Sequence, residues 1–124
     1  MAFKKILVVD DSATMVRIIV NTLEKAGFAN IVTAENGKEA LERLAQHRDI
    51  DLVLSDWNMP EMRGIELLIA MRAAETTKNI PFIMVTSRNV KEDILDAVKA
   101  GANDYLVKPF TVDAIKEKLD KFSK

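Results

Sequence analysis

The sequence predicts an α/β fold in which one doubly wound sheet of five parallel strands carries helices on both faces. Two observations predict it. Five short apolar runs rich in β-branched residues recur along the 124 residues, and a segment with helical periodicity follows each of them. Repeated strand–helix pairs form parallel sheets with right-handed crossovers, and the crossover helices then cover both faces.

The expected strands are residues 6–9, 31–33, 52–54, 82–85 and 105–107. Between and after them, helical spacing predicts five helices. Gly27 follows the first helix where a left-handed cap belongs, and Asn36-Gly37 punctuates the entry to the second. The residues that recur at helical spacing are Met15, Ile18, Ile19, Thr22, Leu23 and Ala26 in the first helix, Ala40, Leu41, Leu44 and Ala45 in the second, Ile65, Leu68 and Met71 in the third, Ile94, Leu95 and Val98 in the fourth, and Val112, Ile115, Leu119 and Phe122 in the fifth.

Composition limits the classes of function. The length predicts one domain over residues 1–124. Cysteine is absent, which excludes disulfides and thiolate zinc sites and fits a reducing compartment. The formal charge of −1 gives no field that favours nucleic acid or an anionic membrane, and no apolar stretch approaches membrane-spanning length. We therefore expect a monomeric cytoplasmic protein that recognises its partners locally.

Polar side chains stand where four of the expected strands stop. Asp10 and Asp11 follow the first strand; Asp56, Thr86 and Lys108 come at or just beyond the ends of the third, fourth and fifth. Because the carboxyl ends of parallel strands meet in one crevice, these side chains are expected to converge. Crowded carboxylates repel unless a cation joins them, and oxygen ligands suit Mg²⁺. A carboxylate beside Mg²⁺ is a competent nucleophile toward phosphorus, so the sequence predicts a metal-assisted phosphoryl acceptor at Asp56.

Each of these residues also has a structural interpretation. Asp11 or Ser12 could cap the first helix, Thr86 could simply close a strand, and Lys108 could be a solvated surface lysine. Taken singly, these alternatives are about as good as the functional ones; their joint occurrence at four strand ends favours a site. The glycine-rich loops that bind dinucleotides or nucleoside triphosphates are absent, and His47 lies in a polar stretch with no second ligand nearby.

Four motifs carry a family resemblance over essentially the whole chain. VVDDS, SDWNMPEMRGIELL, MVTS and YLVKPF resemble the receiver domains of two-component response regulators. The run from Trp57 to Pro60 is most similar to the stand-alone chemotaxis regulators among them. The resemblance implies the flavodoxin-like strand order 2-1-3-4-5.

The resemblance also implies a role for each site residue. Asp56 matches the phosphoacceptor, and Asp10 and Asp11 match the acidic pair that holds Mg²⁺ together with the backbone carbonyl of Asn58. Thr86 and Lys108 match the residues that contact the phosphoryl group. The domain is accordingly not expected to be an enzyme in the usual sense, but to assist its own phosphorylation and dephosphorylation.

A second implied site is a partner surface. Tyr105 matches an aromatic residue that moves between exposed and buried positions. The surface of the fourth helix, fifth strand and fifth helix is expected to bind the flagellar motor switch through Tyr105 with Lys91, Ile94, Val98 and Lys118. Ser87 and Arg88 depart from the family pattern, and with Asn58 they are expected to set the lifetime of the acyl phosphate.

The function expected is a phosphorylation-controlled binding switch in chemotaxis at the flagellar motor: a histidine kinase phosphorylates Asp56, and a phosphatase is a further candidate partner. The alternative within the family is a phosphorelay intermediate or phosphate sink that binds no motor. Outside it, a flavodoxin-like cofactor protein and a small aspartyl phosphatase share the pattern. The three converging acids would repel the phosphate of a flavin, which argues against the cofactor protein. Asn58 stands where an aspartyl phosphatase is expected to carry its second acid, which argues against the phosphatase.

Overall fold

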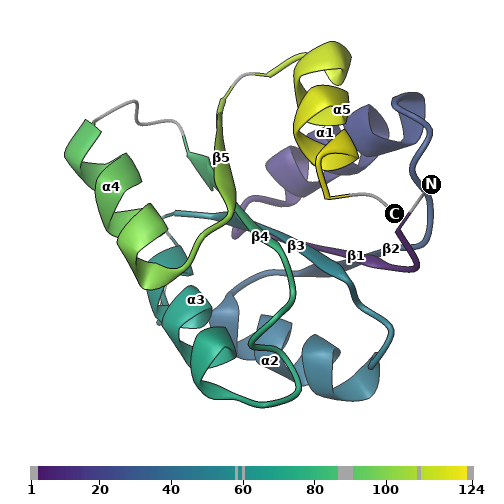
Figure 1. Ribbon diagram of the computed structural model, residues 1–124. Helices are drawn as coiled ribbons and strands as arrows, with labels where there is room; N and C mark the ends of the chain where they lie inside the picture. The colour runs from purple at the N-terminus through teal and green to yellow at the C-terminus, as the bar shows by residue number, and fades with distance from the viewer. Residues whose placement is uncertain (1–2, 58, 60, 87–90, 109, 123–124) are drawn as a thin grey trace.

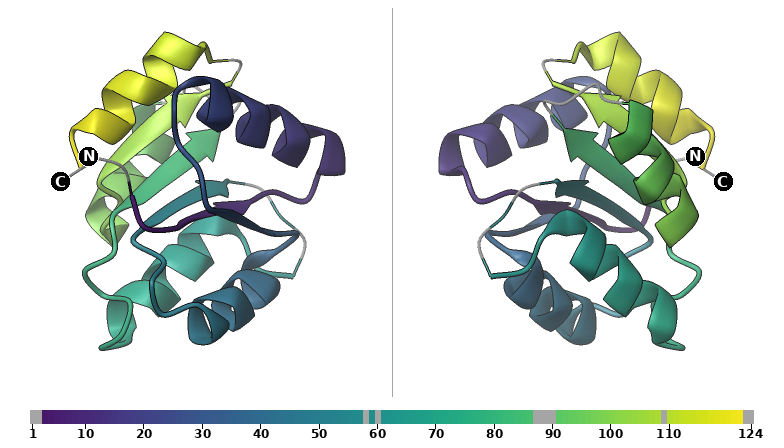
Figure 2. Two further views of the ribbon diagram at one scale, coloured as in Figure 1. Left: turned by 90° about the vertical axis from the view of Figure 1, so that its right-hand side faces the viewer. Right: turned by 90° about the vertical axis from the view of Figure 1, so that its left-hand side faces the viewer.

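Five parallel strands form one sheet between two layers of helices (Figures 1 and 2). The computed structural model describes residues 3–57, 59, 61–86, 91–108 and 110–122, with the helix alone described over 91–94. The strand order is β2-β1-β3-β4-β5, which confirms the predicted architecture and order.

All five strands occur where the sequence predicts them, and four are one or two residues longer. They are β1 (Ile6–Val9), β2 (Ile31–Ala34), β3 (Leu52–Asp56), β4 (Phe82–Thr86) and β5 (Asp104–Val107). Parallel pairing extends the ladders: Asp56 lies opposite Val85, and Thr86 lies opposite Val107. Asp56 and Thr86 are therefore the last residues of their strands, and each is still paired with a residue of the neighbouring strand.

The helices are α1 (Ala13–Lys25), α2 (Gly37–Gln46), α3 (Gly64–Ala73), α4 (Lys91–Ala100) and α5 (Val112–Asp120). Side-chain oxygens cap three of them: Ser12, Asn36 and Thr111 each accept a hydrogen bond from the backbone N–H three residues on, at 2.7–3.2 Å. Gly27 follows α1 with φ +96°, the left-handed cap that the sequence predicts. None of the helices in the described ranges is long and apolar enough to cross a membrane.

The core consists of two apolar layers, one on each face of the sheet. Alternate residues of β1 divide between them: Ile6 and Val8 face α1 and α5, whereas Leu7 and Val9 face α2, α3 and α4. This division follows from the period of two along a strand. The three central strands, β1, β3 and β4, are buried almost throughout, so their carboxyl ends provide a rigid edge for a site.

Helix α4 exposes two of the apolar residues that recur along it. Leu95 and Val98 are 45% and 52% exposed, and Ala97 is the buried residue at 1%. Helix α4 lies at the edge of the molecule against α3, and over residues 95–100 only a narrow stripe of it is covered (Figure 1). A small residue fits this close contact, and the larger apolar side chains turn to solvent. The side chain of Ile94 lies outside the described residues.

Candidate metal and phosphoryl-acceptor site

Three carboxylates meet at the carboxyl edge of the sheet. Asp10 and Asp11 directly follow β1, and Asp56 ends the neighbouring β3. One carboxylate oxygen of each lies within 4.8 Å of the others. The register of β1 and β3 brings this about, because it sets Val9 opposite Ser55 and so places the next residues of both strands side by side.

The ammonium of Lys108 joins two of these carboxylates. Its Nζ lies 3.0 Å from Asp10 Oδ2 and 3.0 Å from Asp56 Oδ1. Lys108 follows β5, which is two strands away from β3, so its long side chain reaches across the end of β4. Its backbone N–H donates to Thr86 O at 2.7 Å, which holds the strand end from which it projects. The side chain is only 13% exposed, so it is not a solvated surface lysine.

The electrostatics of the site reflect crowding in a partly dry environment. Burial raises the pKa of Asp56, the charge of Asp10 raises it further, and the hydrogen bond from Lys108 only partly offsets both. Burial alone would lower the pKa of Lys108, but its hydrogen bonds to Asp56 and Asp10 outweigh this and raise it. Three carboxylates against one ammonium leave a net charge of −2 when all are ionised. A divalent cation would neutralise it.

The donor set fits Mg²⁺. Its members offer carboxylate oxygens only, the hard ligands that Mg²⁺ prefers. Asp10 is 1% exposed and uses Oδ1 to accept the Ser12 N–H at 2.9 Å, which fixes its carboxylate. Ser12, not Asp11, caps α1, so the exposed carboxylate of Asp11 is left for the cluster.

Gly64 is a site residue that sequence reasoning missed. A Cβ at this position would overlap the backbone oxygen of Asp56 and lie 3.0 Å from Met84 Sδ. The N–H of Gly64 also donates to Trp57 O at 2.9 Å, which draws the start of α3 against the end of β3. In the sequence Gly64 is indistinguishable from an ordinary turn glycine, because the close approach comes from tertiary packing.

The other predicted site residues divide into three groups. Thr86 is 4% exposed at the end of β4, next in the sheet to Asp56. Tyr105 is half-buried on β5, with Lys118 Nζ 5.0 Å from its ring centroid, and Val98 is exposed on α4. Asn58, Ser87 and Arg88, and the side chains of Lys91 and Ile94, fall outside the described residues.

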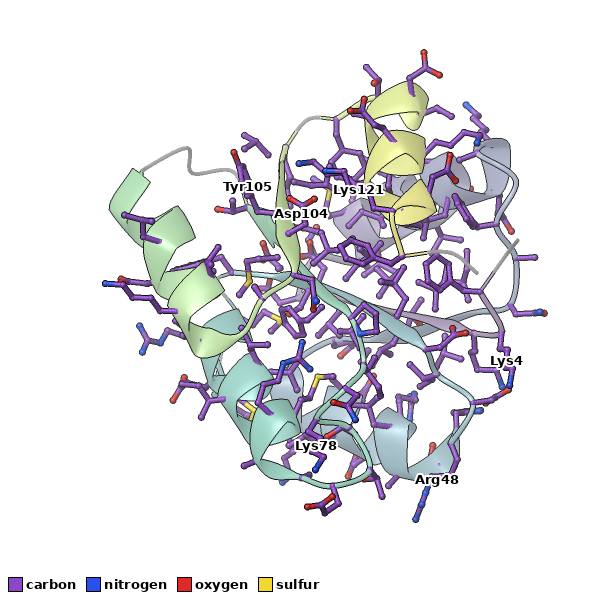
Figure 3. All side chains as sticks on the ribbon, viewed as in Figure 1. Lys4, Arg48, Lys78, Asp104, Tyr105 and Lys121 are labelled. Carbon is purple, nitrogen blue, oxygen red and sulfur yellow. The ribbon has the colours of Figure 1, made fainter. Side chains whose placement is uncertain are left out.

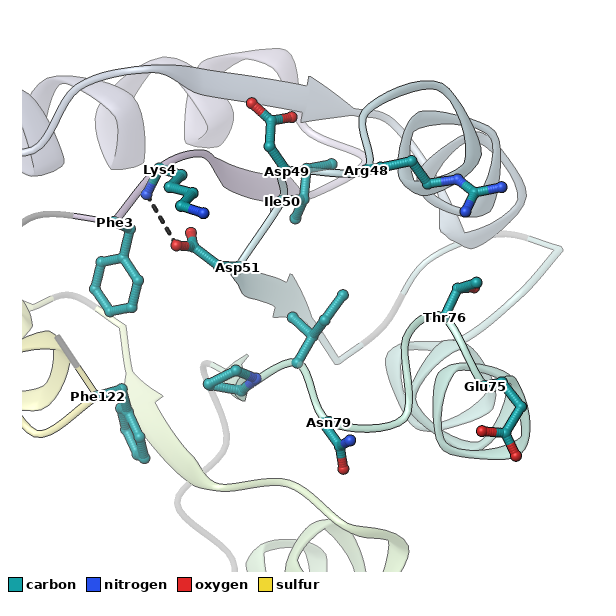
Figure 4. A pocket seen from close by; sticks show the side chains of 12 residues that line it. Phe3, Lys4, Arg48, Asp49, Ile50, Asp51, Glu75, Thr76, Asn79 and Phe122 are labelled. Atoms are coloured by element: carbon teal, nitrogen blue, oxygen red, sulfur yellow. Dashed lines mark hydrogen bonds between the residues drawn. The ribbon is translucent and has the colours of Figure 1, made fainter. Parts of the chain in front are cut away.

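A separate cavity of about 710 Å³ opens at the amino edge of the sheet (Figure 4). Phe3, Ile50, Pro81 and Phe122 contribute its apolar walls, and Asp51 at its rim accepts the Lys4 N–H at 2.9 Å. Apart from Phe122, its residues precede β1, β3 and β4, whereas Asp10 and Asp11 follow β1 and Asp56 ends β3. The cavity therefore lies at the opposite edge from the candidate site.

Residues 6–120 match the family model of the response regulator receiver domain. The chain belongs to the response regulator receiver family. The matched residues include all five strands and the cluster of Asp10, Asp11 and Asp56, so the match covers both the core and the candidate site.

Curated relatives place this receiver domain among those of the CheY type. It is 49% identical over 116 residues to chemotaxis protein CheY1 of Helicobacter pylori, covering 94% of each chain. It is 50% identical over 117 residues to chemotaxis protein CheY-3 of Vibrio cholerae, covering 94% of this chain and 89% of the relative.

Solved structures agree with the fold. Chemotaxis protein CheY4 of Vibrio cholerae superposes with a TM-score of 0.88 at 34% identity, covering 97% of this chain and 98% of that one. The receiver domain of a Pseudomonas aeruginosa sensor histidine kinase, with a magnesium ion coordinated in its active-site cleft, superposes with a TM-score of 0.86 at 27% identity, covering 97% of both chains.

Proposed function

We propose that this receiver domain, spanning residues 1–124, accepts a phosphoryl group on Asp56 from a histidine kinase and acts as a phosphorylation-controlled binding switch in chemotaxis. One observation carries the proposal: the Asp56 carboxylate lies among Asp10, Asp11 and the Lys108 ammonium at the edge of the sheet. The kinship to chemotaxis proteins at 48–50% identity supports the pathway.

The chemistry is the transfer of a phosphoryl group from nitrogen to oxygen. A carboxylate oxygen of Asp56 attacks phosphorus, the P–N bond to the kinase's phosphohistidine breaks with its electron pair on nitrogen, and an acyl phosphate forms. Asp56 suits the role of nucleophile because it ends the central strand β3 and its side chain, 12% exposed, keeps some access to solvent. Asp10 is more deeply buried and already holds a backbone N–H.

Mg²⁺, when bound, supplies positive charge to the phosphoryl oxygens as negative charge develops on them. Asp10, Asp11 and Asp56 would hold it, with the backbone carbonyl of Asn58 as a further ligand. The clustered carboxylate oxygens and the magnesium-bound Pseudomonas relative support this assignment.

Lys108 and Thr86 are the proposed contacts of the phosphoryl group. In the unphosphorylated protein Lys108 bridges Asp10 and Asp56, so it is already within hydrogen-bond distance of the reacting carboxylate. After transfer the same ammonium can pair with a phosphoryl oxygen. Thr86 ends the strand between β3 and β5, from which its hydroxyl could donate to the same group.

The proposed output surface comprises α4, β5 and α5, and the proposed partner is the flagellar motor switch protein. Tyr105 would couple Thr86 to this surface, because β5 pairs with β4 and Met84 lies opposite Tyr105. The exposed Leu95 and Val98 on α4 offer apolar contact area, and Lys118 on α5 offers positive charge. A relay or phosphate sink remains the alternative, but the chain is less similar to the kinase receiver, at 27% identity, than to the chemotaxis proteins.

Phosphate mapping tests the proposal. We expect a small phosphodonor with Mg²⁺ to add one phosphoryl group to the wild type, and mass spectrometry to place it on Asp56. Asp56→Asn should abolish incorporation, whereas the matched control Asp51→Asn, at the opposite edge of the sheet, should keep it. Phosphate on Asp10, Asp11 or Ser12 instead would overturn the assignment.

A further inference from the structure

Asp104 is a nearly buried carboxylate that the proposed function does not use. It begins β5, directly before Tyr105, and its side chain is 13% exposed. Its Oδ1 accepts two hydrogen bonds, one from the Tyr105 N–H at 2.8 Å and one from Lys118 Nζ at 2.9 Å. Burial tends to raise the pKa of Asp104, but the hydrogen bond from Lys118 and the Tyr105 N–H outweigh it and lower the pKa, so the carboxylate is charged.

The lysine that Asp104 holds also covers the aromatic ring of Tyr105. Lys118 Nζ lies 5.0 Å from the Tyr105 ring centroid, within the range of a cation–π contact. Lys118 comes from α5, 14 positions along the chain from Asp104, so the two contacts tie α5 to β5 at the ring. Figure 3 shows Asp104 between β5 and α5, with Tyr105 close by on the same strand.

Without the carboxylate, little would hold Lys118 in this place. An ammonium is strongly hydrated on a flexible stem, and a cation–π contact at an exposed site is weak. Lys121 provides a comparison: its Nζ lies 3.5 Å from Asp104 Oδ2, its side chain is 55% exposed, and it makes no cation–π contact with a ring in the described part of the chain. The short bond to Asp104 therefore selects Lys118 as the group against the ring.

We propose that Asp104 is a positioning residue of the switch: its carboxylate holds the Lys118 ammonium against Tyr105 and so keeps the ring in its present orientation. The inference rests on the proposed function, in which Tyr105 links the phosphorylation site to the partner surface. It assigns the resting position of that link to an ion pair between β5 and α5. A partner that draws Lys118 away from Asp104 would also release the ring.

Nuclear magnetic resonance of the unphosphorylated protein tests the inference without a partner. Tyr105 is the sole tyrosine, so selective labelling isolates its ring signals. Two quantities are measured: the upfield ring-current displacement of the Lys118 ε-methylene signal, and the broadening of the Tyr105 ring signal by a soluble nitroxide. The first reports whether the lysine covers the ring, and the second reports how open the ring is to solvent.

Asp104→Asn keeps an oxygen that can accept the Tyr105 N–H but removes the charge. We expect the Lys118 signal to lose most of its upfield displacement and the broadening of the Tyr105 ring to increase. Lys118→Met keeps the apolar stem and removes the cation, so it should increase the broadening too. Lys121→Met is the matched control and should change neither quantity.

An unchanged Lys118 displacement in Asp104→Asn would overturn the inference, as would equal effects of Lys118→Met and Lys121→Met on the ring. If Asp104→Asn does not fold, Lys118→Met still tests the inference, because position 118 is partly exposed and tolerates the change. Broadening of the Tyr105 ring signal equal to that of wild type would then exclude the contact. These measurements are independent of phosphate mapping on Asp56. The positioning role can therefore fail while phosphorylation succeeds, and the reverse.

Discussion

At the scale of single residues, the site depends on close approaches that bring charged groups and backbone together. Lys108 lies at the same distance from Asp10 and Asp56, and burial strengthens both contacts because little water competes. Gly64 allows α3 to begin close to the end of β3, because only a residue without a side chain fits against the backbone oxygen of Asp56.

We predict that Gly64→Ala destabilises the protein by about 1–3 kcal/mol, the usual range for an inserted methyl group without room. The added Cβ must displace the backbone of Asp56, so the rate of phosphorylation should fall as well. Urea unfolding and phosphate incorporation measure the two effects. Gly37→Ala is the comparison: its Cβ would come within 2.7–2.9 Å of Met62 side-chain atoms, so stability should fall there too, but the backbone of Asp56 is not touched and the rate of phosphorylation should not fall. An equal loss of phosphorylation rate in both variants would show that the approach to Asp56 is unimportant.

At the scale of elements, α4 carries one buried small residue and two exposed large apolar residues over positions 95–100. Ala97 is 1% exposed, whereas its neighbour Val98 is 52% exposed. Exposed apolar side chains of this size suit a surface that a partner covers.

We predict that Val98→Asp leaves the free energy of unfolding within about 0.5 kcal/mol of wild type and abolishes binding to a motor-switch peptide. The new charge would be buried without a partner in the complex, but it is solvated in the free protein. Ala97→Asp should instead unfold the domain, since it buries the charge in the core. Urea unfolding and a peptide titration distinguish the two, and undiminished binding by Val98→Asp would remove Val98 from the surface.

The contact between β5 and α5 makes stability depend on pH. The folded pKa of Asp104 lies below its unfolded value, which is about 3.9 for aspartate, so its contribution is fully present above that value and is lost as pH falls through the folded pKa. We predict that Asp104→Asn is less stable than wild type at pH 7 by on the order of 1 kcal/mol, because the pair is partly solvated. Urea unfolding should show this difference shrinking below pH 4. A constant difference would assign the effect to packing.

At the scale of the whole molecule, the alternation of apolar runs and helical periods was enough to predict the layers, all five strand positions and the convergence of Asp10, Asp11 and Asp56. Parallel topology makes this inference possible, because it sends every strand end to one edge. The burial of Ala97 could not be predicted. Leu95 and Val98 are the apolar residues that recur at helical spacing in α4, and only the position of α4 at the edge of the molecule decides that Ala97 packs against the core. The pairing of Asp104 with Lys118 likewise depends on tertiary contact.

Occupation of the acidic cluster should stabilise the whole domain. At Mg²⁺ concentrations about 100-fold above the dissociation constant, a ligand bound only by the folded state adds about 2.7 kcal/mol. We predict a corresponding rise in melting temperature for wild type and a change in the fluorescence of Trp57, the sole tryptophan, which is adjacent to Asp56. Asp11→Asn should lose most of both responses, since Asp11 is exposed and its carboxylate has no part in the cap of α1. Equal responses in wild type and variant would exclude Asp11 as a ligand.

The most direct test of the proposed switch is the affinity for a motor-switch peptide with and without a phosphoryl mimic on Asp56. Coupling free energies between two sites are typically about 1–3 kcal/mol, which corresponds to an affinity gain of roughly 5 to 150-fold. We predict a gain in this range for wild type and the loss of most of it in Thr86→Ala, which should still be phosphorylated. Equal affinity in the two states, together with rapid phosphate transfer to a second histidine protein, would contradict the switch and identify a relay.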